Sequence, residues 1–134
     1  MRKIALTCAA LAAMAIGAPA LEAREKLTGE ARLAKILEGR EAGRPTSCID
    51  TSVARDLEII DKTALVYKSG SVYYVNRPTD ASRLDDDDIL VTELHGSQLC
   101  RLDMVRMHDR SGGWYRGFVP LGDFVPYRRV AMKD

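Results

Sequence analysis

The chain has 134 residues, of which 46% are hydrophobic and 29% are charged, and its 20 basic and 19 acidic side chains give a formal net charge of +1. This length and composition fit one globular domain with one modest core. A nearly neutral chain has no net electrostatic attraction to nucleic acid or to an anionic membrane, so we expect no nucleic-acid partner.

The first 23 residues have the order of a secretory signal peptide. Arg2 and Lys3 precede an uncharged, mostly apolar run from Ile4 to Ile16, and small residues follow this run. The run is too short to span a bilayer, which takes about 20 apolar residues. We expect cleavage after Ala20, or after Ala23, because each position fits the preference of the signal peptidase for small residues.

Residues 24–134 are expected to form a single small domain that is periplasmic or secreted. This part has 18 basic and 18 acidic side chains, because Arg2, Lys3 and Glu22 are lost with the signal peptide. No later stretch is apolar enough to cross a membrane, so we expect no transmembrane segment after cleavage.

The first element of the domain is a predicted helix from Leu27 to Glu38, along which apolar residues recur at helical spacing. Thr28 is a suitable N-cap and Gly39 a suitable C-terminal stop. Pro45 prevents any continuation of the helix.

Beyond Cys48 the apolar period changes towards two, which predicts short antiparallel strands separated by turns. Residues 57–60 are a short apolar run. The expected strands are residues 63–67, 72–75, 89–94, 114–119 and 124–127, and residues 100–107 form either a strand or a helical turn. Residues 68–71 are predicted to be a four-residue hairpin loop, and Pro126 predicts an edge position for the last strand. The predicted fold class is α+β, with the N-terminal helix packed on a small antiparallel β-sheet curled into a barrel or sandwich.

Two of the three cysteines remain after processing, because Cys8 lies in the signal peptide. Thiols outside the inner membrane are usually paired, so we expect a disulfide between Cys48 and Cys100. On the loop-entropy model, closing this loop stabilises the fold by about 4 kcal/mol. Two free thiols, a redox couple and a metal site are the alternatives. No Cys-x-x-Cys is present and only His95 and His108 could complete a metal site, so we expect no cofactor.

Six short segments of the chain carry a resemblance to other proteins: Ser47–Asp50, Ile59–Ala64, Tyr74–Pro78, Leu84–Val91, Gly96–Cys100 and Gly122–Tyr127. Together they resemble a group of small exported two-cysteine proteins of unknown function from Gram-negative bacteria, over about residues 30–130. The resemblance implies export and a two-cysteine domain, and it implies no activity.

Four adjacent carboxylates, those of Asp85, Asp86, Asp87 and Asp88, form the most unusual local feature. Such groups repel one another and favour solvent, a cation or a basic partner. No Asp-x-Asp-x-Asp-Gly loop surrounds them, and adjacent side chains of an extended segment point to opposite faces. The main interpretation is a solvated acidic turn, and a weak divalent-cation site is the alternative.

His95, Ser97 and the pair His108-Asp109 suggest a hydrolase, which needs a nucleophile, a base within hydrogen-bond reach and a group that orients the base. Ser97 has no nucleophile-elbow pattern around it, and neighbours such as His108 and Asp109 diverge on a strand. Polar loop residues beside strand ends are the simpler interpretation, so no catalytic residue is assigned.

The aromatic residues are the remaining candidates for a binding surface. Neighbours at 73–74 and at 114–115 should point to opposite faces of a sheet, with one of each pair in the core. Phe118 and Phe124 are both predicted to be core residues. An exposed aromatic row would suit a sugar, a peptide or a protein partner.

We therefore expect an exported, non-enzymatic module that binds a protein or a cell-envelope component. A small periplasmic hydrolase that uses His95 or His108 is one alternative, and a structural envelope protein is another.

The export signal can be tested by mass. When the full chain is expressed in a Gram-negative host, the intact mass of the recovered protein should correspond to an N-terminus at Leu21 or Arg24. Recovery of the full-length chain from the cytoplasm would contradict this expectation.

Overall fold

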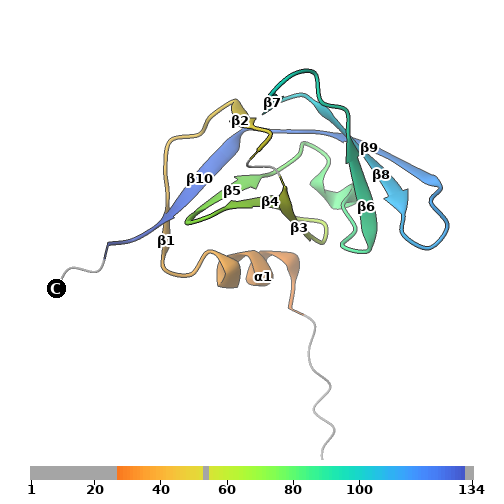
Figure 1. Ribbon diagram of the computed structural model, residues 1–134. Helices are drawn as coiled ribbons and strands as arrows, with labels where there is room; N and C mark the ends of the chain where they lie inside the picture. Colours follow the sequence, from red (N-terminus) through yellow and green to blue (C-terminus); the bar gives the residue numbers. More distant parts are fainter. Residues whose placement is uncertain (1–26, 53–54, 132–134) are drawn as a thin grey trace, which may run out of the picture.

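The computed structural model describes residues 27–52 and 55–131, which form one α-helix, one short 3-10 helix and three antiparallel sheets (Figure 1). The predicted signal peptide, its two cleavage sites and Cys8 lie outside the described residues. The broad α+β class is confirmed.

Helix α1 (Gly29–Ile36) begins at the predicted N-cap, because the Thr28 side chain accepts a hydrogen bond from the Ala31 N–H at 3.3 Å. The helix is shorter at both ends than predicted, and Leu37 is its C-cap. Gly39 then has a φ of +73°, a conformation that glycine adopts without steric cost, and it leads the chain into the first strand.

The largest sheet has the strand order β1-β10-β5-β4-β3. Its strands are β1 (Arg40–Ala42), β3 (Asp56–Ile60), β4 (Ala64–Ser69), β5 (Val72–Asn76) and β10 (Phe124–Arg129). The hairpin predicted between β4 and β5 is confirmed, but its loop is shorter than predicted. Ser69 pairs directly with Val72, so that only Gly70 and Ser71 connect the strands, and Gly70 has the positive φ that two-residue hairpin turns need.

The predicted edge position of Pro126 is wrong, because β10 lies between β1 and β5. The Pro126 carbonyl accepts a hydrogen bond from the Gly43 N–H at 2.7 Å, and Gly43 directly follows the end of β1. The N and the carbonyl O of one strand residue point to the same neighbouring strand. The missing amide hydrogen therefore faces the end of a three-residue strand, where the ladder stops, and β5 loses no bond.

The other two sheets come from the middle of the chain. One has the order β6-β8-β9 and the other pairs β2 with β7. Their strands are β2 (Cys48–Asp50), β6 (Asp88–Thr92), β7 (Gln98–Cys100), β8 (Met104–Asp109) and β9 (Tyr115–Pro120). The ambiguous stretch 100–107 thus contains the end of β7, a turn and the start of β8.

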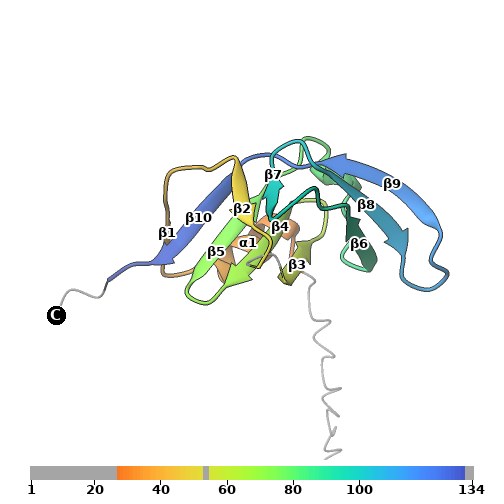
Figure 2. The ribbon, with the colours of Figure 1, turned by 45° about the horizontal axis from the view of Figure 1, so that its top comes forward.

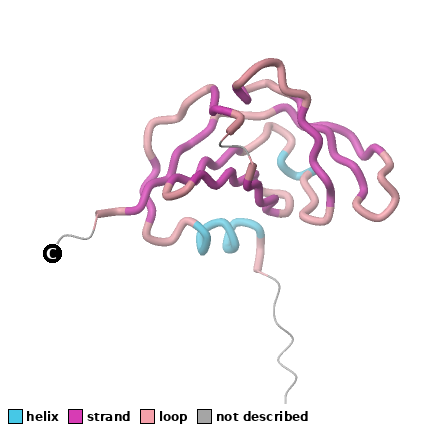
Figure 3. Tube along the Cα trace, in the orientation of Figure 1, coloured by secondary structure: helices cyan, strands magenta, loops and turns pink. Residues whose placement is uncertain are grey.

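The sequence predicts a sheet curled into a barrel or sandwich, but the sheets do not close on one another into a barrel. Figures 1 and 2 show the three-stranded sheet at one end of the molecule and β1 at the other, and Figure 3 shows the strands of the three sheets along the chain trace. Among the described residues no ladder joins β6 or β9 to β1 or β3. The four outer strands of the two larger sheets therefore remain edges.

One core cluster draws side chains from all three sheets. Its buried members are Ile49, Leu65, Tyr67, Leu84, Leu99, Val105, Met107, Val119, Leu121 and Phe124. A second cluster lies on the α1 side of the five-stranded sheet, where Leu33 packs with Ile60, Ala64, Val66 and Val75. The predicted opposition of Tyr73 and Tyr74 is confirmed, because Tyr74 packs against the first cluster and Tyr73 against the second.

The predicted disulfide between Cys48 and Cys100 is present. The two residues are directly opposite each other in the β2–β7 pair, with their Cα atoms 4.0 Å apart. The bond closes the smallest sheet covalently and fixes Ile49 and Leu99, the neighbours of the cysteines, in the first core cluster.

Phe124 and Phe118 have different environments, although both are predicted to be in the core. Phe124 is fully buried and its ring meets that of Tyr67 edge-on, with the centroids 5.8 Å apart. Phe118 is 43% exposed, so its predicted core position is wrong. Trp114 and Tyr115 are both exposed as well, so the prediction that one of them lies in the core is wrong. Tyr115 is on an edge strand and Trp114 precedes that strand.

This difference predicts unequal losses of stability. Phe124→Ala should lower the free energy of unfolding by about 3–5 kcal/mol, because it leaves a cavity where all three sheets meet. Phe118→Ala should change it by about 1 kcal/mol or less. Urea unfolding of both variants measures the difference, and equal losses would contradict the assignment of the core.

Candidate functional site

Most of the exposed apolar surface gathers on one sheet. Among the described residues, eight of the ten exposed large hydrophobic side chains lie on the outward side of the β6-β8-β9 sheet or directly beside it. We call these eight the outer face: Ile89, Val91, Leu94, Leu102, Met104, Trp114, Tyr115 and Phe118. Large contiguous apolar surfaces are uncommon on monomeric proteins and mark sites of interaction.

The strand register brings residues of the outer face together in rows. Val91 of β6, Arg106 of β8 and Phe118 of β9 form one row across the sheet. Ile89 and Tyr115 flank His108 in the next row, where their side chains are close enough to interact. The alternate residues, among them Val105 and Met107, are buried on the inner side.

Among the residues that the structure describes, Leu102 is the most exposed large apolar residue, and its backbone is strained. It is 65% exposed, and it has a φ of +71°. The Asp103 N–H bonds the Cys100 carbonyl at 3.1 Å, which places Leu102 at the third position of a four-residue turn, where glycine is favoured. An L-residue in this left-handed conformation costs about 1–2 kcal/mol, so neither burial nor backbone geometry accounts for a leucine here.

A hollow of about 240 Å³ lies next to Leu102. It is lined by Glu93, His95, Leu102, Asp103, Met104 and Arg106. Arg106 pairs with Glu93 at 2.6 Å, and Asp103 adds a second carboxylate to the lining. Arg106 lies between Val91 and Phe118 on the central strand, so the outer face is apolar with this ion pair inside it.

The four aspartates predicted to form a solvated turn are instead paired with arginines. Asp86 bonds Arg32 of α1 at 3.2 Å, and Asp87 lies 3.5 Å from Arg110. Asp85 and Asp88 both contact the same guanidinium at the start of β9, that of Arg116, at 3.5 and 3.0 Å. The run therefore connects α1 and the β8–β9 hairpin to the segment before β6.

Asp88 is the buried member of this run, with only 2% of its side chain exposed. Burial raises the pKa of the Asp88 carboxyl above its usual value, whereas Arg116 lowers it less, and the nearby carboxylates of Asp85 and Asp109 add to the rise. One oxygen of Asp88, Oδ2, has no hydrogen-bond partner among the described residues.

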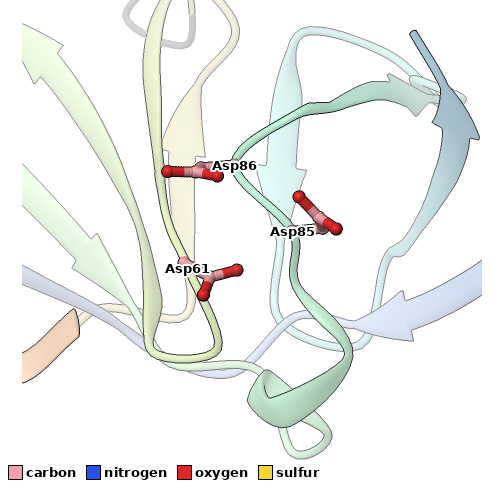
Figure 4. Close-up of side chains that lie close together, drawn as sticks. All are labelled: Asp61, Asp85 and Asp86. Carbon is pink, nitrogen blue, oxygen red and sulfur yellow. The ribbon is translucent and has the colours of Figure 1, made fainter. Parts of the chain in front are cut away.

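The carboxylates that lie close together are not the four named in the predicted cation site. Asp85 and Asp86 come together with Asp61 of the β3–β4 turn, with one carboxylate oxygen of each within 4.8 Å of the others (Figure 4). Asp87 and Asp88 are not part of this group. Arg116 and Arg32 already neutralise Asp85 and Asp86, so a cation would have to compete with both arginines.

The two histidines do not assemble a hydrolytic site among the described residues. His108 Nδ1 lies 3.2 Å from the Gly113 carbonyl oxygen, and its ring lies beside that of Tyr115. His95 is exposed, and no hydrogen bond joins it to Ser97 or to a carboxylate within the described ranges. Of the carboxylates beside His95, that of Asp103 instead accepts the Cys100 N–H at 2.7 Å.

Comparison with known proteins identifies no family for this chain. No protein-family model matches the chain, and neither a curated protein nor a solved structure matches it. Within residues 27–52 and 55–131, no helix has the length and apolar character needed to cross a membrane.

The aliphatic part of the outer face could not be predicted from the sequence, where only the aromatic residues suggested a binding surface. Its aliphatic members Ile89, Val91 and Met104 alternate with buried residues, and this pattern is also that of an ordinary half-buried strand. Leu102 could not be found either, because residues 100–107 are predicted as one strand or helical turn and the break between β7 and β8 is seen only in the structure.

The competition at Asp61, Asp85 and Asp86 predicts weak cation binding. Calcium up to micromolar concentration should leave the melting temperature unchanged, because a ligand stabilises a fold only where it binds the folded state well. Thermal melting with calcium, and with sodium at equal ionic strength, measures this. A large rise at micromolar calcium would show that the cation displaces the arginines.

Proposed function

We propose that this protein is an exported, non-enzymatic binding module whose outer face docks a partner protein. The observation that carries the proposal is Leu102, a large apolar side chain that is held 65% exposed in a strained turn, within the surface where the exposed apolar residues gather. A leucine that the fold does not require is explained by a partner that buries it.

The chemistry of the outer face favours a protein over a membrane. Trp114, Tyr115 and Phe118 supply the large, rigid contact area typical of the energetic centres of protein interfaces. A membrane surface would attract unpaired cations around the apolar residues, but Arg106 is neutralised by Glu93. The partner's matching surface should therefore be mostly apolar, with polar groups opposite Arg106 and His108.

Export is the second part of the proposal. It is supported by the signal-peptide pattern of residues 1–23 and by the resemblance to small exported two-cysteine proteins. The Cys48–Cys100 disulfide agrees with an oxidising compartment such as the periplasm or the extracellular space.

The hydrolase alternative rests on the histidines alone. His95 lies beside the outer face, in the hollow next to Leu102, and there it can contribute to binding without a nucleophile. A structural envelope role differs from the proposal only in whether one defined partner is bound, which the experiment below decides.

The decisive variant is Leu102→Gly. Glycine relieves the strain of the left-handed conformation, but it also raises the conformational entropy of the unfolded chain. The free energy of unfolding should therefore stay equal or rise by about 1 kcal/mol or less. With a photo-crosslinking residue at Phe118 in the exported protein, we expect an adduct with one defined envelope protein, and at least a fivefold lower yield in Leu102→Gly.

Two controls make this result specific. The same crosslinker at Lys35, an exposed position on α1, should give no such adduct. Lys62→Gly makes the same replacement in another strained turn and should leave the yield unchanged. An adduct of twice the mass of the chain would assign the outer face to a second copy. An unchanged yield in a folded Leu102→Gly protein would also reject the proposal.

A further inference from the structure

A second hollow of about 240 Å³ lies on the other side of the three-stranded sheet. It is lined by Lys62, Ser82, Arg83, Leu84, Asp85, Met107 and Arg116. Leu84 and Met107 are buried core residues and supply an apolar floor. Three of the other side chains are cationic, so the wall of the hollow is predominantly positive.

The three cations differ in how they are neutralised. Arg116 is shared by Asp85 and Asp88, at 3.5 and 3.0 Å. Lys62 and Arg83 are both exposed, and their side chains have no hydrogen-bond or ion-pair partner in the part of the chain that the structure describes. Asp85 also lines the hollow and shares Arg116 with Asp88, and the carboxylate of Asp61 lies close to that of Asp85. Lys62 and Arg83 are therefore the two lining cations without an ion-pair partner in the described part of the chain.

The backbone of Lys62 is strained in the same way as that of Leu102. The Thr63 N–H bonds the Ile60 carbonyl at 3.0 Å, so Lys62 is the third residue of a four-residue turn, and its φ is +52°. Its own N–H donates to the Leu84 carbonyl at 2.9 Å, which holds the turn against the floor of the hollow. Glycine is favoured at such a position, so the turn itself gives no reason for a lysine.

The Arg83 guanidinium lies over Gly117, which has no side chain. Arg83 ends the 3-10 helix η1 (Ala81–Arg83), and a Cβ atom at Gly117 of β9 would be only 3.1 Å from Nη2. Gly117 has a φ of +118°, which L-residues rarely adopt. The absence of a Cβ at Gly117 thus leaves room for the guanidinium beside Met107.

We propose that this hollow binds an oxyanion, a phosphate or carboxylate group, through Lys62 and Arg83, with the Ser82 hydroxyl as a further donor. Arginine donates two parallel hydrogen bonds to such groups, and lysine adds a compact point charge. The nearby carboxylate of Asp85 limits the affinity, so we expect a dissociation constant in the millimolar range for a small free anion. The site faces away from the outer face and does not rest on the function proposed for it.

The test titrates the disulfide-bonded protein with inorganic phosphate and, separately, with succinate, each against sodium chloride at equal ionic strength. Backbone amide NMR shifts should saturate at millimolar anion and should centre on Lys62, Arg83 and Gly117. Tighter binding of one probe decides between a phosphate and a carboxylate as the preferred group.

Lys62→Gly and Arg83→Gln should each weaken binding at least fivefold, whereas the melting temperature of Lys62→Gly should be unchanged or higher. Leu102→Gly is the matched turn control and Arg129→Gln the matched charge control, and both should bind normally. Shifts that do not saturate by 20 mM, shifts scattered over the surface, or normal binding by a folded Lys62→Gly protein would each overturn the proposal.

Discussion

The burial of Phe124 is the contact on which the rest of the structure depends. Its ring lies in the cluster that joins all three sheets, and its backbone exchanges two 2.8 Å hydrogen bonds with Thr46, just before the disulfide at Cys48. The preceding turn is held by Asn76, a fully buried side chain that donates to the Gly122 carbonyl and accepts the Gly122 N–H. A Cβ on Gly122 would lie 2.6 Å from the Arg77 carbonyl, so the close approach of this turn requires glycine.

This single junction explains why one face of the three-stranded sheet is free. The inner side chains of β8 and β9 complete the cluster around Phe124, so that the fold needs nothing from their outward neighbours. Residues such as Phe118 and Met104 therefore contribute apolar area that the domain itself does not bury. In a domain whose total stability is on the order of 5–15 kcal/mol, uncovered apolar surface is a liability in solution unless a partner uses it.

Local features of the chain were predictable because they depend on near neighbours. Thr28 caps α1, Gly70 turns the β4–β5 hairpin, and the two cysteines that remain after the predicted cleavage pair with each other. The outward position of Phe118 was not predictable, because alternation shows that a strand has two sides but does not show which side other elements cover.

The ion pairs of the four adjacent aspartates were not predictable for a similar reason. Each of their carboxylates finds an arginine from a distant segment, for example Arg32, 54 residues before Asp86. Charge neutralisation of this kind follows from tertiary folding, and four adjacent aspartates give no information about it. The consequence for function is that Asp85 and Asp88 share one arginine beside the cationic hollow, whereas Lys62 and Arg83 have no ion-pair partner among the described residues.

The two proposed sites share the β8–β9 hairpin and use its opposite sides. Successive strand residues point to opposite faces, so Phe118 of the outer face and its neighbour Arg106 lie on the outward side, whereas Met107 lines the hollow. The register shift between Met107 and His108 places Arg116 as an extra residue on β9, and its guanidinium reaches Asp88 on the inner side. The bulge thus supplies a cation to one site without removing a residue from the apolar rows of the other. Each site also contains one non-glycine residue with a positive φ, Leu102 or Lys62, at a turn position where glycine would relieve strain. Stability alone would select glycine at both positions, so what these turns have in common is that each presents a side chain for which the fold has no use.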